Sequence, residues 1–337
     1  MGLRSFIRES LQQRRRGGAG QRVVVLGGGT GMATALRGLK RERVALTAIV
    51  SLADDGGSSG ILREQLGIPP VGDLRNCLIA LADAESTAGA LLQHRLPAER
   101  GATRGHPVGN LLLAAAIAEE GGDLERGIER VHRILHVRGR VIPATSGALR
   151  LRGRTRAGVS VLGQAALART RGIERVALEA GSVKATEGAL DAIRDADLLV
   201  LGPGSLYTSV IPHLLVPEIR EALAQRRAPL IWVANVDEQE GETEGMDLDA
   251  HLDALVEHGA EDLIDLVLAS TPAPRESGVA GVPLQPRVAR ETSRNGAARP
   301  PIEVRAIASR LRPHLHDPVL LAKALLASRA RLKGGDR

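Results

Sequence analysis

A glycine-rich loop between an apolar strand and a helix is the feature of this sequence that most constrains its fold. The apolar run Val23–Leu26 is short and ends in glycine, which is typical of a buried parallel strand. The loop Gly27–Gly31 follows, and apolar residues then recur at helical spacing as far as Leu39. A second apolar run, Leu46–Leu52, comes next. The order strand, glycine loop, helix, strand predicts an α/β fold, with a Rossmann-like, doubly wound and mostly parallel sheet.

The rest of the chain continues this alternation with one interruption. Short β-like pieces with glycines at their turns run from about 137 to 178, and they predict a small antiparallel excursion. Further strands are expected at Leu198–Leu201, Leu230–Ala234 and Ile264–Ala269, and a closing helix at 317–332. Residues 272–301 are rich in Pro, Gly, Ser and Arg and indicate an irregular segment. We therefore expect one α/β domain over 22–332, preceded by an arm at 1–21.

Composition excludes several classes of protein. The single cysteine, Cys77, rules out a disulfide framework and any cysteine-based zinc or iron–sulfur site. The longest apolar stretches, such as Leu111–Ala118, are far shorter than the roughly 18 residues of a membrane span. The first residues contain no apolar core of a secretory signal, so we expect a cytoplasmic protein.

The formal net charge of +6 comes largely from the N-terminal arm, since five arginines and one glutamate fall within the first 20 residues. A solvated, flexible tail explains this arm better than a nucleic-acid contact does. The chain holds one Phe, one Tyr and one Trp, too few for a platform on which bases stack. Nucleic acid is therefore not the expected partner.

Four distinctive loops follow predicted strands directly, and this is the main functional signal. They are Gly27–Gly31, Asp54–Gly60, Gly202–Ser205 and the segment from Asn235 onward. Ligands of an open parallel sheet bind at the carboxyl ends of its strands, so the four loops should meet at one edge.

The first loop would direct backbone N–H groups and a helix N-terminus at an anion, with Thr30 adding a hydroxyl donor. The loop is neither G-x-G-x-x-G nor a P-loop, so neither a dinucleotide dehydrogenase nor an NTPase follows from it. A tight turn between strand and helix is the alternative. Gly202, Gly204 and Ser205 resemble a second anion site, with Thr208 and Ser209 as further hydroxyl donors.

Several polar side chains near these loops have more than one interpretation. Asp54 and Asp55 could accept hydrogen bonds from ribose, hold Mg²⁺ beside phosphates, or simply form a turn. Asp73 is predicted to cap a helix, while Arg75 and Asn76 could reach a diphosphate. Asn235 offers a donor and an acceptor to a base or amide.

Taken in order, these motifs resemble the YvcK-like gluconeogenesis factors of the CofD-like superfamily. The likeness spans about residues 22–330. Its motifs are Gly27–Gly31, Ala53–Gly60 with Leu62 and Arg63, Pro69–Leu78, Gly109–Leu111, Arg140–Thr145, Gly202–Val210 with Pro212, Gly241–Thr243, His251–Leu252 and His316–Pro318. The catalytic branch, 2-phospho-L-lactate transferase, tends to carry a Pro-Asp-x-Asp-Thr signature where this chain has Pro69–Asn76. The chain also departs from the family at Asp237–Glu240, where a Met-Thr-Gln-Pro-like run is usual.

The resemblance implies a cytoplasmic, Rossmann-like protein that binds a nucleotide-sugar, UDP-N-acetylglucosamine, and supports cell shape and envelope synthesis during gluconeogenic growth. It is compatible with partners among envelope-synthesis proteins or kinases, and with self-association. A regulatory protein without turnover is favoured and no catalytic residue is assigned. The alternative is a Mg²⁺-dependent transferase acting on a nucleotide diphosphate donor, with Asp54 and Asp55 as metal ligands.

The expected ligand-binding residues are Gly28, Gly29, Thr30, Gly31, Asp54, Asp55, Ser58, Ser59, Asp73, Arg75, Asn76, Asn110, Gly202, Gly204, Ser205 and Asn235.

Overall fold

A computed structural model describes residues 20–97, 105–179, 183–272, 281–285, 291–292, 296 and 298–334. The first 19 residues of the expected basic arm lie outside these ranges. So does much of the segment at 272–301, which holds no helix or strand in its described residues.

The centre of the molecule is a seven-stranded sheet in the order β10-β9-β8-β7-β1-β2-β3, and every neighbouring pair in it is parallel. Its strands are β1 (Gln21–Gly27), β2 (Val44–Val50), β3 (Arg140–Pro143), β7 (Leu198–Leu201), β8 (Leu230–Val233), β9 (Leu266–Ser270) and β10 (Ile302–Arg305). This arrangement confirms the predicted fold class. The inner strands are continuous apolar runs because both of their faces are covered.

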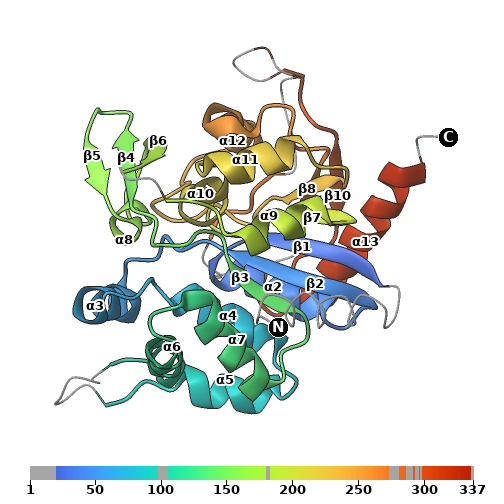
Figure 1. Ribbon diagram of the computed structural model, residues 1–337. Coiled ribbons are helices and arrows are strands. Elements are labelled where there is room, and N and C mark those ends of the chain that lie inside the picture. Colours follow the sequence, from blue (N-terminus) through green and yellow to red (C-terminus); the bar gives the residue numbers. More distant parts are fainter. Residues whose placement is uncertain are drawn as a thin grey trace.

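Two helical layers cover the two faces of this sheet (Figure 1). Along β1, Val23 and Val25 pack into one apolar cluster, and Val24 and Leu26 pack into the other. The first cluster contains side chains of α2 (Gly29–Leu39), α4 (Gly72–Leu81), α6 (Val108–Glu119), α7 (Leu124–Leu135) and α13 (Pro318–Gly334). The second contains side chains of α9 (Glu187–Arg194), η1 (Leu206–Val210), α10 (Ile211–Leu214), α11 (Pro217–Ala224), α12 (Leu248–Leu255) and η2 (Val256–Ala260).

The antiparallel excursion is smaller than predicted. It is a sheet in the order β5-β4-β6, made of β4 (Leu151–Thr155), β5 (Ser160–Leu162) and β6 (Ile173–Leu178), with α8 (Gln164–Leu167) between the last two. β3 lies within the predicted excursion, but it pairs in parallel with β2 and belongs to the main sheet. The reason is that Val141 and Ile142 are buried on opposite faces of that sheet, one in each apolar cluster.

Aspartate side chains cap the starts of α12 and α13, but not the start of α4. Asp247 accepts a hydrogen bond from the Ala250 amide at the start of α12. Asp317 likewise accepts from the amides of Val319 and Leu320 before α13. Asp73 does not cap: α4 begins at Gly72, whose amide donates to the hydroxyl of Ser59 at 3.1 Å and not to Asp73.

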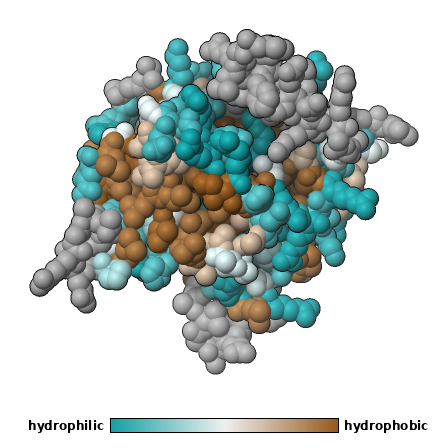
Figure 2. All heavy atoms as spheres, turned by 60° about the horizontal axis from the view of Figure 1, so that its bottom comes forward, coloured by the Kyte–Doolittle hydropathy of each residue, from teal (hydrophilic) through white to brown (hydrophobic). Residues whose placement is uncertain are grey.

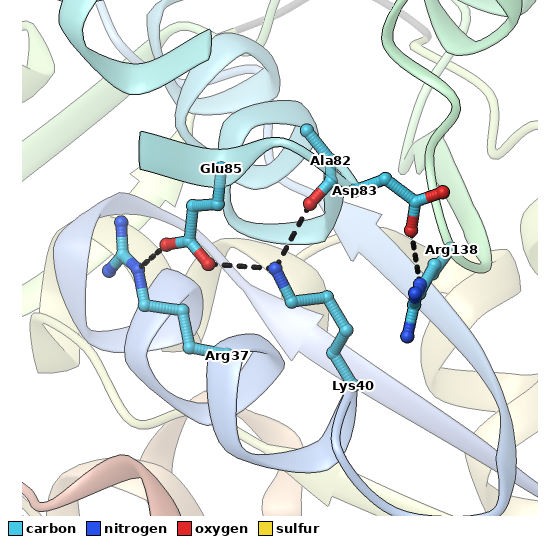
Figure 3. A network of polar contacts seen from close by, with 6 residues as sticks. All are labelled: Arg37, Lys40, Ala82, Asp83, Glu85 and Arg138. Carbon is cyan, nitrogen blue, oxygen red and sulfur yellow. Dashed lines mark hydrogen bonds and ion pairs between the residues drawn. The ribbon is translucent and has the colours of Figure 1, made fainter. Parts of the chain in front are cut away.

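A polar network ties α2 to α5 (Glu85–Gln93) at the rim of the helical layer (Figure 3). Glu85 pairs with Arg37 and, at 2.7 Å, with Lys40, whose ammonium group also donates to the carbonyl of Ala82. Burial raises the pKa of Glu85, but the two cations outweigh it and hold that pKa below its usual value. The pairs are partly exposed, so they orient the helices more than they stabilise them.

Figure 2 shows a continuous apolar area on the face that is turned downward in Figure 1. The helices at this end include α5 and α7, where Leu91 and Ile134 are more than half exposed. Exposed apolar areas of this kind are typical of surfaces that contact other proteins. In the part of the chain that the structure describes, no helix is both long and apolar enough to cross a bilayer.

Candidate functional site

The site lies where the strand order of the sheet reverses. β1 has β2 on one side and β7 on the other, and the crossovers run to opposite faces of the sheet from this point. Such a switch point leaves a crevice beyond the carboxyl ends of the two central strands. The two predicted glycine loops begin at these ends, after Gly27 and Leu201.

The two glycine loops lie against each other. A Cβ atom on Gly31 would lie 2.7 Å from the carbonyl oxygen of Pro203, and one on Gly204 would lie 3.4 Å from that of Gly28. α2 begins at Gly29, and its N-cap residue Gly28 has no side chain with which to cap it; the amide of Gly29 donates to the carboxylate of Asp73 instead. Glycine is required here because side chains would separate the loops.

Asp73 extends from the first turn of α4 to the first glycine loop. Its carboxylate accepts a hydrogen bond from the amide of Gly29, and a Cβ on Gly28 would lie 2.6 Å from its Oδ2. Burial, then the charge of Asp54, raises the pKa of Asp73 to about 6. The predicted cap is therefore wrong for this residue: its side chain contacts a different helix, the one that begins the fold.

Asp54 and Asp55 point in different directions. Oδ1 of Asp54 accepts from the Gly56 amide at 3.1 Å, and a Cβ on Gly72 would lie 2.6 Å from its Oδ2. Asp55 instead accepts from the amides of Gln164 and Ala165, at 2.9 and 2.8 Å, and so holds the start of α8. Successive residues of an extended chain face opposite sides, which separates this pair.

A metal site made of Asp54 and Asp55 is consequently wrong in its second ligand, and the carboxylates that the structure brings together are those of Asp54 and Asp73. Among the described residues there is no group of three or more His, Cys, Asp or Glu suited to a metal ion. Mg²⁺ beside phosphates needs only one or two carboxylates, so Asp54 and Asp73 fit that use.

A chain of buried hydrogen bonds lies beside this carboxylate pair. Ser58, on α3 (Gly57–Leu66), is 2.7 Å from Nδ1 of His106 and accepts from Asn110 at 2.9 Å. Arg75 in turn donates to Asn110 at 2.8 Å and to Asn76 at 3.0 Å. The Nε atom of Arg75 is buried with no partner. The guanidinium is thus held in a fixed place with a donor to spare.

These groups line a cavity of about 230 Å³. Its walls include the first turns of α3, α4 and α6, and none of these helices has a side-chain cap. Uncapped helix starts carry partial positive charge, and Arg75 and Arg95 also line the cavity. Burial, then the charge of Arg95, lowers the pKa of Arg75, which an anion between the two cations would relieve. The cavity is suited to a phosphate or another anion.

Part of the second predicted anion site is already occupied by the chain itself. The carboxylate of Glu242 accepts from the amides of Tyr207 and Thr208, at 2.6 and 2.9 Å, and from the Thr208 hydroxyl at 3.1 Å. Thr208 is therefore not the ligand donor that we predicted. Burial raises the pKa of Glu242, although these hydrogen bonds oppose the shift.

Ser205 and Asn235 are joined through Gln239. The Gln239 amide donates to the Ser205 hydroxyl at 2.8 Å and accepts from Asn235 at 3.2 Å. The loops after β7 and β8 thereby share one polar cluster beside the glycine loops.

Of the predicted residues, Asp54, Ser58, Ser59, Asp73, Arg75, Asn76 and Asn110 line the cavity together. Gly28 lies next to it through Asp73, Asp55 is turned away from it, and Thr30, Ser205 and Asn235 do not line it. Gln239 and Glu242 were not predicted as site residues. A signal existed for Glu242, since it lies in one of the family motifs, but its partners are 34 and 35 residues away.

The fold and this crevice define a class of protein, and comparison with known proteins identifies it. The family model described as 2-phospho-L-lactate transferase CofD matches residues 23–290, and the chain belongs to this family.

Two curated relatives and one solved structure show in more detail which proteins this chain is similar to. The chain is 46% identical over 247 residues to the gluconeogenesis factor of Halalkalibacterium halodurans, covering 73% of this chain and 76% of that protein. It is 41% identical over 251 residues to the gluconeogenesis factor of Bacillus subtilis, covering 74% and 78%. A crystal structure of a UPF0052-family protein from Bacillus halodurans superposes with a TM-score of 0.82 at 38% identity, covering 92% of this chain and all of that one.

Proposed function

We propose that this protein is a gluconeogenesis factor that binds a nucleotide-sugar, UDP-N-acetylglucosamine. It would act as a regulatory protein and would not convert this ligand into a product. Its similarity to proteins named gluconeogenesis factor supports the first part of this proposal. We expect the protein to bind this ligand in the cytoplasm. The role would be support of cell shape and envelope synthesis during growth on gluconeogenic carbon sources.

The convergence of anion-binding groups at the switch point carries this proposal. The amides of Gly28–Gly31 and the guanidinium of Arg75 would hold the diphosphate. Asp54, on the rim of the cavity, would accept from ribose hydroxyls, and Asn235 would contact the base. Ser58 and Asn110 position Arg75 and are already satisfied by each other.

Calorimetry with UDP-N-acetylglucosamine tests the binding. Saturable binding is expected. UDP should bind more weakly because it lacks the sugar, and UMP should bind much more weakly because it also lacks the diphosphate. Arg75→Gln should weaken binding by about tenfold or more, since a charge-assisted contact is worth about 1.5–3 kcal/mol. Glu64→Gln, on the exposed side of α3, is the matched control and should bind as the parent does. Absence of binding at about millimolar ligand would contradict the proposal.

A transferase is the second candidate, and the proximity of Asp54 and Asp73 favours it. The two carboxylates would hold Mg²⁺, which when bound stabilises charge on a diphosphate. Release of nucleoside monophosphate from a nucleotide diphosphate donor, lost in Asp54→Asn, would establish turnover. Unchanged donor together with saturable binding would leave the regulatory function.

The role in the cell can be examined with a deletion strain of the source organism grown on a gluconeogenic carbon source. Loss of normal shape is expected, with rescue by the parent gene but not by Arg75→Gln. Normal shape in the deletion strain would contradict the cellular part of the proposal and leave the binding part standing.

A further inference from the structure

A second cavity, larger than the one at the switch point, lies elsewhere in the described structure. It has a volume of about 490 Å³ and lies between the end of α3, the turn that joins α6 to α7, the loop after β3 and the start of α9. This size is within the usual range for a small-molecule site. None of the predicted ligand residues lines it, and it shares no residue with the smaller cavity.

Three of the family motifs contribute to its walls residues that have had no role so far. Arg63 follows the Asp54–Gly60 loop, Pro69 begins the motif that leads to α4, and Thr145 ends the run after Arg140. Thr145 is fully buried, and its hydroxyl donates to the carbonyl of Gly147. That hydrogen bond fixes the loop after β3 as a rigid wall.

Arg63 brings an unsatisfied cation to this cavity. Its Nη1 atom is buried and has no hydrogen-bond partner in the structure. A buried donor on a charged group is costly to leave unpaired, and most such groups in native proteins have a partner. An anionic group in the cavity would supply that partner.

Glu125 brings an exposed carboxylate to which no donor among the described residues makes a hydrogen bond. It lies beside the first turn of α9, where a Cβ on Gly188 would be 3.6 Å from its Oε2. Burial, then the charge of Asp123, raises the pKa of Glu125, and Arg140 only partly opposes this. Asp123 itself caps α7 by accepting from the amide of Arg126. Glu125 is therefore the carboxylate that is free to receive a donor from a ligand.

The charges of the cavity select the kind of ligand. A phosphate dianion would be repelled by two carboxylates, and a simple cation would leave Arg63 unpaired. A molecule with both an acidic and an ammonium group satisfies Arg63 and Glu125 together. We propose that the larger cavity is a binding site for an amino acid, with its acidic group on Arg63 and its ammonium group on Glu125.

Binding of the proteinogenic amino acids, each at about 10 mM, tests this inference by thermal shift and then by calorimetry. At least one should bind saturably to the full chain, and the oxo acid with the same carbon skeleton, which lacks the ammonium group, should not. Arg63→Gln and Glu125→Gln should each weaken that binding by about tenfold or more. Glu64→Gln is again the matched control, because its exposed side chain is next to Arg63 in sequence and does not line the cavity.

The test is separable from that of the nucleotide-sugar. Arg63→Gln should retain UDP-N-acetylglucosamine binding, and Arg75→Gln should retain amino-acid binding, since the two cavities have separate walls. The inference is overturned if no amino acid binds at this concentration, if the oxo acid binds equally well, or if binding survives both substitutions in the larger cavity.

Discussion

Asp73 is the residue at which stability and binding are most directly opposed. Its carboxyl group is buried between the Gly28 backbone and Asp54, so its ionisation costs more in the folded protein than in the unfolded chain. Such strain is typical of residues kept for a ligand rather than for the fold. The pKa of about 6 lies above the unfolded value of 3.8, so the native state binds a proton that the unfolded state has already lost. Its contribution is favourable below pH 3.8 and is lost as the pH rises through 6.

Asp73→Asn should therefore stabilise the protein at neutral pH by up to about 3 kcal/mol and change little near pH 4. The asparagine oxygen can still accept from the Gly29 amide. Urea unfolding of the parent and the variant between about pH 4 and pH 8 measures the difference. The same variant should bind nucleotide-sugar less well, as expected where stability and function compete. Equal stability of the two proteins at every pH would contradict the buried charge.

At the scale of elements, close helix packing in this fold depends on glycine. α2 and α13 approach so closely that a Cβ on Gly38 would collide with the carbonyl of Pro318, which is backbone and cannot rotate away. Gly38→Ala should cost about 1–3 kcal/mol or more by forcing the helices apart. Gly89→Ala in α5 is the matched control: its Cβ would be 3.5 Å from a methyl group of Ile79, and the helix should gain about 0.5–1 kcal/mol. Thermal unfolding of the two variants should move in opposite directions, and a stable Gly38→Ala protein would refute the close approach.

The start of η1 depends on one carboxylate, that of Glu242. Glu242 accepts from two amides and one hydroxyl at the start of this helix. Glu242→Ala should cost about 3 kcal/mol or more, because it leaves buried donors unpaired. Glu242→Gln keeps an acceptor for the amides and should cost about 1–2 kcal/mol. Glu240→Ala, at an exposed position nearby, should be neutral in the same denaturant titration; equal losses in all three variants would show that the loop, not the carboxylate, matters.

How far the sequence predicts the site depends on the range of the contacts. The strands and the glycine loops were predictable because apolar runs and glycines are local signals, and the parallel topology then brings the loops together. Asp55 and Glu242 were not, since their partners are 109 and 34 residues away and no spacing rule connects them. Asp73 was predicted to cap its own helix, but α4 begins one residue earlier, at Gly72, and the side chain of Asp73 contacts the start of α2 instead.

At the scale of the whole molecule, two buried histidines lie behind the ends of the strands that carry the site. His213 donates from Nε2 to the carbonyl of Gly27, which ends β1, and His316 bonds to the backbone of Ala234, which follows β8. Burial lowers the pKa of both to about 4, from an ordinary 6.5, and the hydrogen bonds only partly oppose it. Both rings are neutral in the folded protein at neutral pH. The two buried histidines therefore contact the same strand ends from which the loops of the site begin.

These buried, neutral histidines predict acid lability with a defined sign. Below pH 6.5 the unfolded chain protonates both histidines while the native state does not, so stability is full above pH 6.5 and is lost as the pH falls toward 4. Each histidine contributes up to about 3 kcal/mol over this window, and Asp73 offsets about one of the two. The net loss should be about 1.4 kcal/mol per pH unit near pH 5, or more, because burial also lowers the pKa of His251 and His258.

His213→Gln keeps a donor for Gly27 but cannot take up a proton, so denaturant titrations across this range should show about 3 kcal/mol less acid destabilisation than in the parent. His94→Gln, at an exposed position, is the matched control and should keep the parental dependence. Because the carbonyl of Gly27 lies at the edge of the first glycine loop, nucleotide-sugar binding should weaken over the same pH interval in the parent and less in His213→Gln. An unchanged pH dependence in His213→Gln would mean that this ring is not buried as the neutral form, and that the acid response arises elsewhere in the core.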